Sequence, residues 1–458
     1  MTATRNREAA LLVAALVAVA FAWGQVQEAM TGSLGDRFWL VVAAFAALAG
    51  AAHLMVRRFA PAADPALLPA VVLLNGLGLA MIHRLDLGEA GRAEAAGLAA
   101  PQATAPSQLL WTALAVVSFA LILIWIRDHR VLQRYTFTAM VAGLVLLLLP
   151  LLPVLGVTIN GARIWVRALG LSFQPAELAK VLLIIFFAGY LTRQRDSLRS
   201  IRAHVLGVPV PRAKDLGPIL LAWAVSMGVL IFERDLGAAL LLFGVFVVML
   251  AVATGRFSWV LIGAVLFAAG AFVAYQLFGH VRTRVDIWLD PFGDPSGSGY
   301  QVVQSLYGLA NGGLLGAGWG QGSPGLVPFA KTDFIVSALG EELGLTGLMV
   351  VVLVYLVIVQ RGIATGLRVR DVFGRLLATG LAFVIGFQAF VIIGGVSGLI
   401  PLTGLTTPFL SAGGSSLLAN WVIVALLMRV SDAARRPPPP PPPAPEQAAT
   451  QVVPVVPS

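Results

Sequence analysis

Long runs of apolar residues dominate this sequence and limit what it can fold into. Twelve segments of about twenty mostly apolar residues follow one another along the chain, and a helix of that length crosses the roughly 30 Å core of a bilayer. Of all residues, 58% are hydrophobic and only 12% are charged, whereas soluble domains are roughly a quarter charged. The sequence therefore predicts an all-α, polytopic membrane protein with about twelve transmembrane helices.

The expected spans lie, in chain order, at Ala9–Trp23, Phe38–Met55, Pro65–Met81, Leu109–Ile126, Tyr135–Leu155, Ala176–Leu191, Leu216–Phe232, Leu236–Thr254, Ser258–Phe278, Ile335–Val359, Leu376–Ile400 and Ser415–Met428. The first run follows two arginines and by itself resembles a signal peptide, but the second run close behind it favours a first membrane helix.

The basic residues predict how the chain crosses the membrane. Twelve spans leave both termini on one side. Of the 31 Lys and Arg residues, 21 lie on the side of the termini, 9 lie on the other side, and Lys180 lies within a span. Because basic loops stay in the cytoplasm, we expect both termini to be cytoplasmic in the plasma membrane. Residues 279–334 then form a large extracellular loop with short interfacial helices, such as Tyr300–Leu309.

Charge and residue usage exclude several classes of site. The formal net charge is +9, but the basic residues stand in short runs between apolar segments, whereas nucleic-acid binding needs them clustered on a soluble face. The chain has no cysteine, so it has no disulfides and no thiolate metal site. Its five histidines have no helical-turn spacing, which argues against a histidine metal site.

The chain ends in a low-complexity segment, 435–458, that begins RRPPPPPPPAPEQ. Polyproline favours an extended helix that buries no core. We expect a disordered cytoplasmic tail, with docking of a proline-binding domain as the alternative.

A polar, glycine-rich stretch, Asn311–Leu345, delivers a carboxylate to the start of an apolar helix at Lys331-Thr332-Asp333-Phe334. Acids beside or within a bilayer are costly and often functional. Asp333 is therefore a candidate catalytic base, and the alternative is a helix N-cap. We expect two acids farther along the same helix, Glu341 and Glu342, to make structural hydrogen bonds.

Other polar residues lie beside the predicted spans. Glu177 and Lys180 are three residues apart on one helical face, so they can form a structural ion pair or bind substrate. Asp235 precedes a span and is either an N-cap or part of a polar cavity. The glycine- and hydroxyl-rich stretch 394–416 interrupts two spans. Irregular backbone at that depth is tolerated where it lines a cavity, so we interpret this stretch as a cavity wall.

Several motifs in this order resemble the shape, elongation, division and sporulation (SEDS) family of RodA and FtsW type peptidoglycan polymerases, and most closely its actinobacterial RodA-like members. The resemblance runs from about residue 109 to 430, in the motifs GARIW, FQPAELAK, DLG, TDFI with GEELG, LIPLTG, and PFLSAGGSS. The sequence departs from the usual family residues at Ile164, Glu233, Arg234, Ile392 and Ala412.

The resemblance implies a core of about ten transmembrane helices at 65–434, so residues 1–64 are expected to be two additional helices. It implies an inverting glycosyltransferase that polymerises lipid II at the outer membrane face, for elongation or division, beside a class B penicillin-binding protein. By position, the family's essential acid falls on Asp333. The resemblance also predicts a set of substrate-binding residues in this chain. They are Arg163, Trp165, Glu177, Lys180, Asp235, Lys331, Thr332, Ser411 and Ser415.

Lipid II carries a diphosphate whose charge must be stabilised as it departs. Arg163, Arg234, Lys331 and a bound divalent cation such as Mg²⁺ or Mn²⁺ are alternatives for that role. A lipid II flippase, which uses a cavity open to both sides, is the main competing function. A scaffold for division or elongation proteins is a third.

Overall fold

A computed structural model describes residues 2–153, 155–159, 162–168, 171–195, 203–205, 208–210, 223–224, 227–228, 231, 233 and 235–436. Ten helices in this part are long and apolar enough to cross a membrane. The predicted all-α, multi-pass fold class is therefore confirmed. These helices are α1 (Thr2–Thr31), α2 (Asp36–Phe59), α3 (Leu67–Ala95), α4 (Ala105–Trp125), α7 (Pro175–Arg193), α10 (Leu236–Thr254), α11 (Ser258–Leu277), α14 (Ile335–Arg368), α15 (Val372–Val396) and α16 (Gly414–Arg435).

Two of the twelve expected spans are not among these ten. Helix α6 (Thr136–Leu148) has 13 residues and continues only as a short 3₁₀ turn at Leu149–Leu151. It stops before the predicted end at Leu155, because Pro150 has no N–H with which to continue the helix. The expected span at 216–232 lies largely outside the described residues. A total of twelve is consistent with the structure and stays a prediction.

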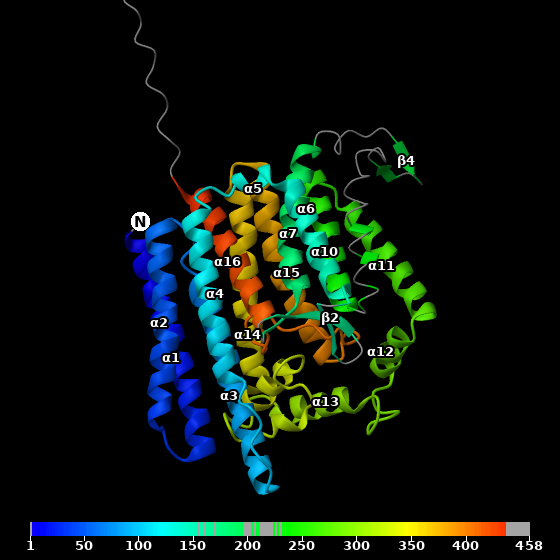
Figure 1. Cartoon of the computed structure of the whole chain (residues 1–458). Coiled ribbons are helices and arrows are strands. Elements are labelled where there is room, and N and C mark those ends of the chain that lie inside the picture. Colours follow the sequence, from blue (N-terminus) through cyan, green and yellow to red (C-terminus); the bar gives the residue numbers. More distant parts are fainter. Residues whose placement is uncertain are drawn as a thin grey trace, which may run out of the picture.

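The two ends of the molecule differ in what they carry. Figure 1 shows the N-terminus and the C-terminal end of α16 at the same end, with α5 (Val131–Arg134) and the hairpin of β4 (Ala203–Val205) and β5 (Val208–Val210). The opposite end carries α12 (Gly279–Leu289) and α13 (Tyr300–Gly312), so helices form in the predicted outer loop. We call these the terminal end and the loop end. The start of α1 and the end of α16 lie on one side, which is consistent with an even number of spans.

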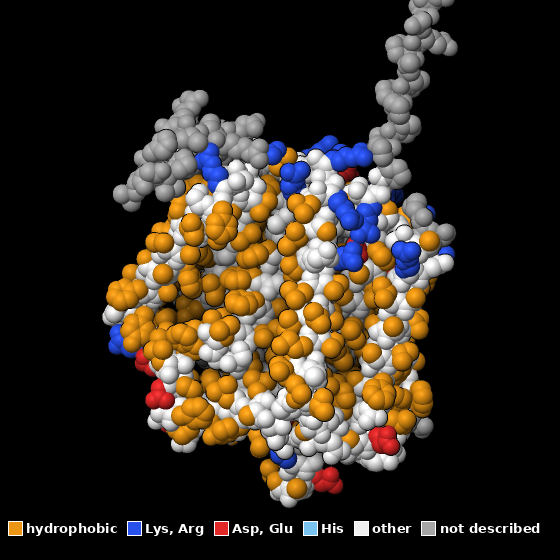
Figure 2. All heavy atoms as spheres, turned by 180° about the vertical axis from the view of Figure 1, so that it is seen from behind, with side chains coloured by type: hydrophobic (Ala, Val, Ile, Leu, Met, Phe, Trp, Pro, Cys, Tyr) orange, Lys and Arg blue, Asp and Glu red, His pale blue; other side chains and the backbone are white. Residues whose placement is uncertain are grey.

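The surface follows the same division. In Figure 2, Lys and Arg side chains gather at the terminal end, acidic side chains stand toward the loop end, and hydrophobic side chains cover the zone between them. A hydrophobic belt between two polar ends is the surface that a bilayer requires.

A small antiparallel sheet precedes α7, where the sequence predicted only a loop. Its strands are β1 (Gly156–Ile159), β2 (Ala162–Ala168) and β3 (Leu171–Phe173), in the order β1-β2-β3. The aromatic and β-branched residues of β2 have the high strand propensity that favours this pairing.

Helix α14 is broken at Gly344, whose φ of 68° and ψ of −173° are not helical. The loop after α13 enters the break, and the amides of Ala317 and Leu345 donate to the carbonyls of Glu341 and Gly313, both at 2.9 Å. A Cβ on Gly344 would lie 2.6 Å from the carbonyl carbon of Leu315, so only glycine fits. The break fixes the outer loop against the start of α14.

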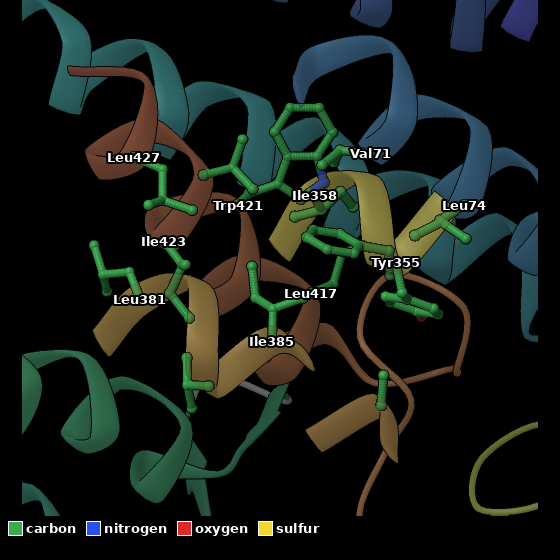
Figure 3. Close-up of a cluster of buried hydrophobic side chains, with 14 of the residues drawn as sticks. Val71, Leu74, Tyr355, Ile358, Leu381, Ile385, Leu417, Trp421, Ile423 and Leu427 are labelled. Atoms are coloured by element: carbon green, nitrogen blue, oxygen red, sulfur yellow. The ribbon is translucent and has the colours of Figure 1, made fainter. Parts of the chain in front are cut away.

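The centre of the bundle is a cluster of apolar side chains around α16. Figure 3 shows Val71 and Leu74 of α3, Tyr355 and Ile358 of α14, Leu381 and Ile385 of α15, and Leu417, Trp421, Ile423 and Leu427 of α16. The indole nitrogen of Trp421 donates to Asn75 Oδ1 at 3.0 Å. Within a bilayer, moving apolar side chains from lipid into the bundle changes their free energy little. Close packing and hydrogen bonds such as this one therefore hold the helices together.

The backbone of α3 lies very close to the 401–413 segment, and a substitution at this contact tests the packing. A Cβ on Gly78 would overlap the carbonyl oxygen of Leu410 and lie 2.6 Å from its Cα. We expect Gly78→Ala to destabilise the protein by about 1–3 kcal/mol, measured as thermal or denaturant unfolding in detergent. Gly50→Ala on α2 is the matched control, since its Cβ would meet nothing within 4 Å; equal effects of both substitutions would contradict the prediction.

Candidate functional site

Asp333 lies in a turn at the loop end, two residues before α14 begins, and is half-buried. The N-cap position of α14 belongs to Phe334, and that position has no side-chain cap hydrogen bond. The structure therefore does not use Asp333 as the N-cap, which was the alternative to a catalytic role.

The surroundings of Asp333 change its acidity. Burial raises its pKa to about 6, although a hydrogen bond from Thr332 and the charge of Arg284 both lower it. A carboxyl group with this pKa is a stronger base than an ordinary aspartate and is still mostly ionised at neutral pH.

Arg284, on α12, is the cation that faces this acid. Its Nη1 donates to the carbonyl oxygen of Leu402 at 2.8 Å. A Cβ on Gly404 would lie 3.4 Å from Arg284 Nη2 and 3.9 Å from Asp333 Oδ2, so both charged groups lie beside this glycine. Burial lowers the pKa of Arg284, while Asp235 and Asp333 raise it. The sequence showed Arg284 only as one of several loop cations; its place between two acids depends on how the loop folds.

Asp235 performs the capping role that the sequence offered as one alternative. Its carboxylate accepts from the amide of Ala238 at 2.9 Å in the first turn of α10 and from Gln174 Nε2 at 3.3 Å. Burial is the largest cause of its raised pKa. Asp235 thus joins the start of α10 to the segment that leads into α7.

Glu177 and Lys180 form the predicted ion pair, with 2.6 Å between Oε2 and Nζ. Lys180 Nζ also donates to Gln388 Oε1 at 2.9 Å, and Gln388 Nε2 donates to the carbonyl oxygen of Thr406 at 2.8 Å. This buried chain of contacts links α7, α15 and the 401–413 segment, so the predicted ion pair is confirmed, and substrate binding by the two residues stays a prediction.

The same pair lines a small cavity that is partly open to solvent. Its polar wall is Gln174, Glu177 and Lys180, and its remaining wall is apolar. Leu405 contributes to this wall, so the prediction that the 394–416 stretch lines a cavity is confirmed at this residue. An apolar cavity with a few polar groups is the usual form of a site for an amphipathic ligand.

Two predicted site serines are buried and already have partners. Ser411 Oγ donates to the carbonyl oxygen of Thr332 at 2.6 Å and accepts from the amide of Thr407 at 2.8 Å. Ser415 Oγ accepts from the amide of Gln174 at 2.8 Å. Both hydroxyls therefore hold backbone segments of the site in place, and their contact with substrate stays a prediction.

Lys331 is held by α3. Its Nζ lies 2.7 Å from Asp86 Oδ1 and 2.7 Å from Glu89 Oε2, and its carbonyl oxygen accepts from the amide of Ala412 at 2.8 Å. Burial alone would lower the pKa of Lys331, but its bonds to the two acids raise it. These contacts indicate that Lys331 positions the loop beside Asp333.

The remaining predicted residues lie on or near β2. Arg163 and Trp165 are half-buried on this strand. Arg163 Nη2 donates to the carbonyl oxygen of Leu152 at 3.0 Å. Arg234, the other candidate cation, lies outside the described residues. Substrate binding by Arg163 and Trp165 stays a prediction.

Glu341 and Glu342 make the structural contacts expected of them. Glu341 Oε1 accepts from the amide of Ser323 at 2.7 Å, and Glu342 Oε1 pairs with Arg84 Nε at 2.7 Å. Within the part of the chain that the structure describes, no group of three or more His, Asp or Glu side chains has a metal-binding arrangement. The divalent cation stays a prediction.

A family model described as cell cycle protein, for FtsW, RodA and SpoVE, matches residues 65–436. The chain is 53% identical over 389 residues to the peptidoglycan glycosyltransferase RodA of Mycobacterium tuberculosis, which covers 85% of this chain and 82% of that relative. It is 37% identical over 307 residues to a probable peptidoglycan glycosyltransferase FtsW of a Geobacter species, covering 66% of this chain and 80% of that relative.

Two solved structures are also similar to this chain. A chain from a study of how a peptidoglycan synthase complex coordinates polymerization and crosslinking matches with a TM-score of 0.64 and 29% identity, over 82% of this chain and 99% of that one. The rod shape determining protein RodA of Thermus thermophilus matches with a TM-score of 0.55 and 27% identity, over 82% of this chain and 98% of that one.

The contacts of Lys331 lead to a stability prediction. We expect Lys331→Met to destabilise the protein by about 3–5 kcal/mol, because it leaves the buried carboxylate of Asp86 without its cation. Glu89→Gln should cost less than about 1 kcal/mol, since Glu89 is more exposed. Unfolding in detergent measures both, and the order of the two effects is the test: a larger loss for Glu89→Gln would contradict it.

Proposed function

The chain belongs to the FtsW/RodA/SpoVE family, and we propose that it is a peptidoglycan glycosyltransferase that polymerises lipid II with Asp333 as general base. The observation that carries the assignment of the base is a half-buried carboxylate and a half-buried arginine that both lie beside Gly404, with the charge of the arginine lowering the pKa of the carboxylate. One group can take a proton while the other stabilises negative charge, as glycosyl transfer from a diphosphate requires.

The reaction follows from these two groups. Asp333 removes the proton from the 4-hydroxyl of the acceptor sugar while that oxygen attacks the anomeric carbon of the donor. The new C–O bond forms as the bond from the anomeric carbon to the diphosphate breaks, so the configuration inverts and the electron pair leaves with the diphosphate. Arg284 is the cation whose charge lowers the pKa of the base, and we assign it the stabilisation of the charge that leaves with the diphosphate. Asp333 then returns its proton to solvent.

The site is proposed to face outward. On the face shown in Figure 2, Lys and Arg side chains gather at the terminal end, which supports a cytoplasmic position for that end. Asp333 and the outer loop lie at the opposite end, where the sugars of lipid II are found. The cavity beside Glu177 and Lys180 has apolar walls suited to the lipid chain.

The proposed partner is a class B penicillin-binding protein that crosslinks the new glycan. Support comes from the similar chain studied within a synthase complex for polymerization and crosslinking. Whether the pair acts in elongation or in division is decided by which partner co-purifies with the tagged chain.

The central prediction concerns Asp333. With the purified chain, its partner and labelled lipid II, we expect Asp333→Asn to lower the rate of glycan formation by at least about 100-fold, the size of general-base assistance. Asp290→Asn, an exposed acid in the same loop, is the control and should retain activity. No glycan from the wild-type chain with any partner, together with movement of lipid II across liposomes, would instead support a flippase.

The acidity of the site gives a second prediction. Activity should fall as pH decreases through about 6, because Asp333 becomes protonated and cannot accept the proton. Arg284 lowers the pKa of Asp333, so Arg284→Gln should move this acid limb to higher pH and reduce the maximal rate. The control is Arg282→Gln, an exposed arginine on the same helix. An acid limb that stays in place in Arg284→Gln would remove Arg284 from the site.

A further inference from the structure

Helix α1 is packed into the bundle along its whole length. At the terminal end, Arg5 pairs with Glu8 and donates to the carbonyl oxygen of Ala63, before α3. In the middle, Val19 fits over Gly76 of α3, where an added Cβ would lie 2.6 Å from Val19 Cγ1. These contacts distinguish α1 from a helix that only anchors the chain in lipid.

At the loop end, α1 holds one turn of α3. The ring of Trp23 stacks on that of His83, with 4.5 Å between centroids and 12° between planes. Gln27 Oε1 lies 2.9 Å from His83 Nε2. Trp23 is only 4% exposed, so its indole is part of the packed interior.

The residues that follow His83 on α3 hold the loop that carries Asp333. Arg84 Nε pairs with Glu342 at 2.7 Å, and Arg84 Nη2 donates to the carbonyl oxygen of Gly322 at 2.7 Å. Asp86 and Glu89 bind Lys331, two residues before Asp333. Within two turns, α3 thus contacts α1 with one residue and the outer loop with three.

The last turn of α1 also touches the outer loop directly. Gly320 has a φ of +78°, and a Cβ there would lie 2.6 Å from the Cβ of Ala29. The amide of Gly320 donates to Glu342 Oε2 at 3.1 Å. Ala29 therefore packs against the turn that the Arg84–Glu342 pair holds.

We propose that α1 is a positioning helix for the catalytic loop: Trp23 and Gln27 fix the His83 turn of α3, Ala29 supports the Gly320 turn, and together they set the place of Asp333. The proposal rests on the proposed function, because it concerns the base of that reaction. It gives α1, which lies ahead of the family-matched region that begins at residue 65, a role in positioning the base.

The first test separates positioning from folding. We expect Trp23→Ala to lower kcat for lipid II polymerisation by roughly tenfold, less than the ~100-fold that a displacement of about 1 Å can cost, with little change in KM. Trp23→Phe keeps a stacking ring and should recover most of the rate. Phe21→Ala, on the lipid side of α1 and 65% exposed, should behave as wild type. Equal rates for wild type and Trp23→Ala would overturn the proposal, as would an equal loss in Phe21→Ala.

The second test examines the direct contact and does not depend on Trp23. Gly320→Ala introduces a methyl group that collides with Ala29, and Ala29→Gly removes the collision. We expect the double variant to be more active than Gly320→Ala alone, with the remaining loss due to the positive φ. No rescue by Ala29→Gly would show that α1 does not support this turn.

A third readout needs no activity and so distinguishes failure of the inference from failure of the proposed function. The chain contains no cysteine, so Val327→Cys, at a position that is 4% exposed in the outer loop, supplies one thiol. Its labelling by a maleimide should be at least several-fold faster when Trp23→Ala is added and unchanged when Phe21→Ala is added. Equal labelling in both backgrounds would overturn the positioning role even if the wild-type chain made no glycan.

Discussion

The pairing of Lys331 with Asp86 and Glu89 is the interaction on which the rest of the site depends. A charged amine removed from water is stable only beside carboxylates that are held in place. Lys331 is on the outer loop, while both acids are on α3. The loop therefore cannot leave the bundle without separating buried charges, and Asp333, two residues along the chain, remains close to α3.

The other side of this loop is held by backbone contacts. Ser411 and Ala412 bind the carbonyl oxygens of Thr332 and Lys331, and the segment that carries them is packed on α3 at Gly78. In an apolar bundle few polar contacts compete with these, so a small number of hydrogen bonds determines where the base lies. Arg284 then reaches the same place from α12, bound to the carbonyl oxygen of Leu402. The result is that the carboxylate of Asp333 and the guanidinium of Arg284 are held at the loop end by separate parts of the chain.

Prediction from sequence succeeded where the partners are close in the chain. Glu177 and Lys180 are one helical turn apart, and Asp235 directly precedes the helix that it caps, so local geometry was enough to identify both contacts. It did not find the internal partners of Lys331, Ser411 and Ser415, whose contact with substrate stays a prediction. Their partners are far away in the chain, as with Lys331 and Asp86, and no local pattern shows such a pair.

The sequence by itself determined the membrane class, most of the spans and the acid to examine, because hydrophobic run length and charge placement act locally along the chain. The tertiary structure decided which role each polar residue has. It gave the N-cap position of α14 to Phe334 and left Asp333 beside Arg284, and it placed α1 against the turn of α3 that holds the loop. These outcomes depend on contacts between helices that are distant in sequence, and only packing brings such helices together.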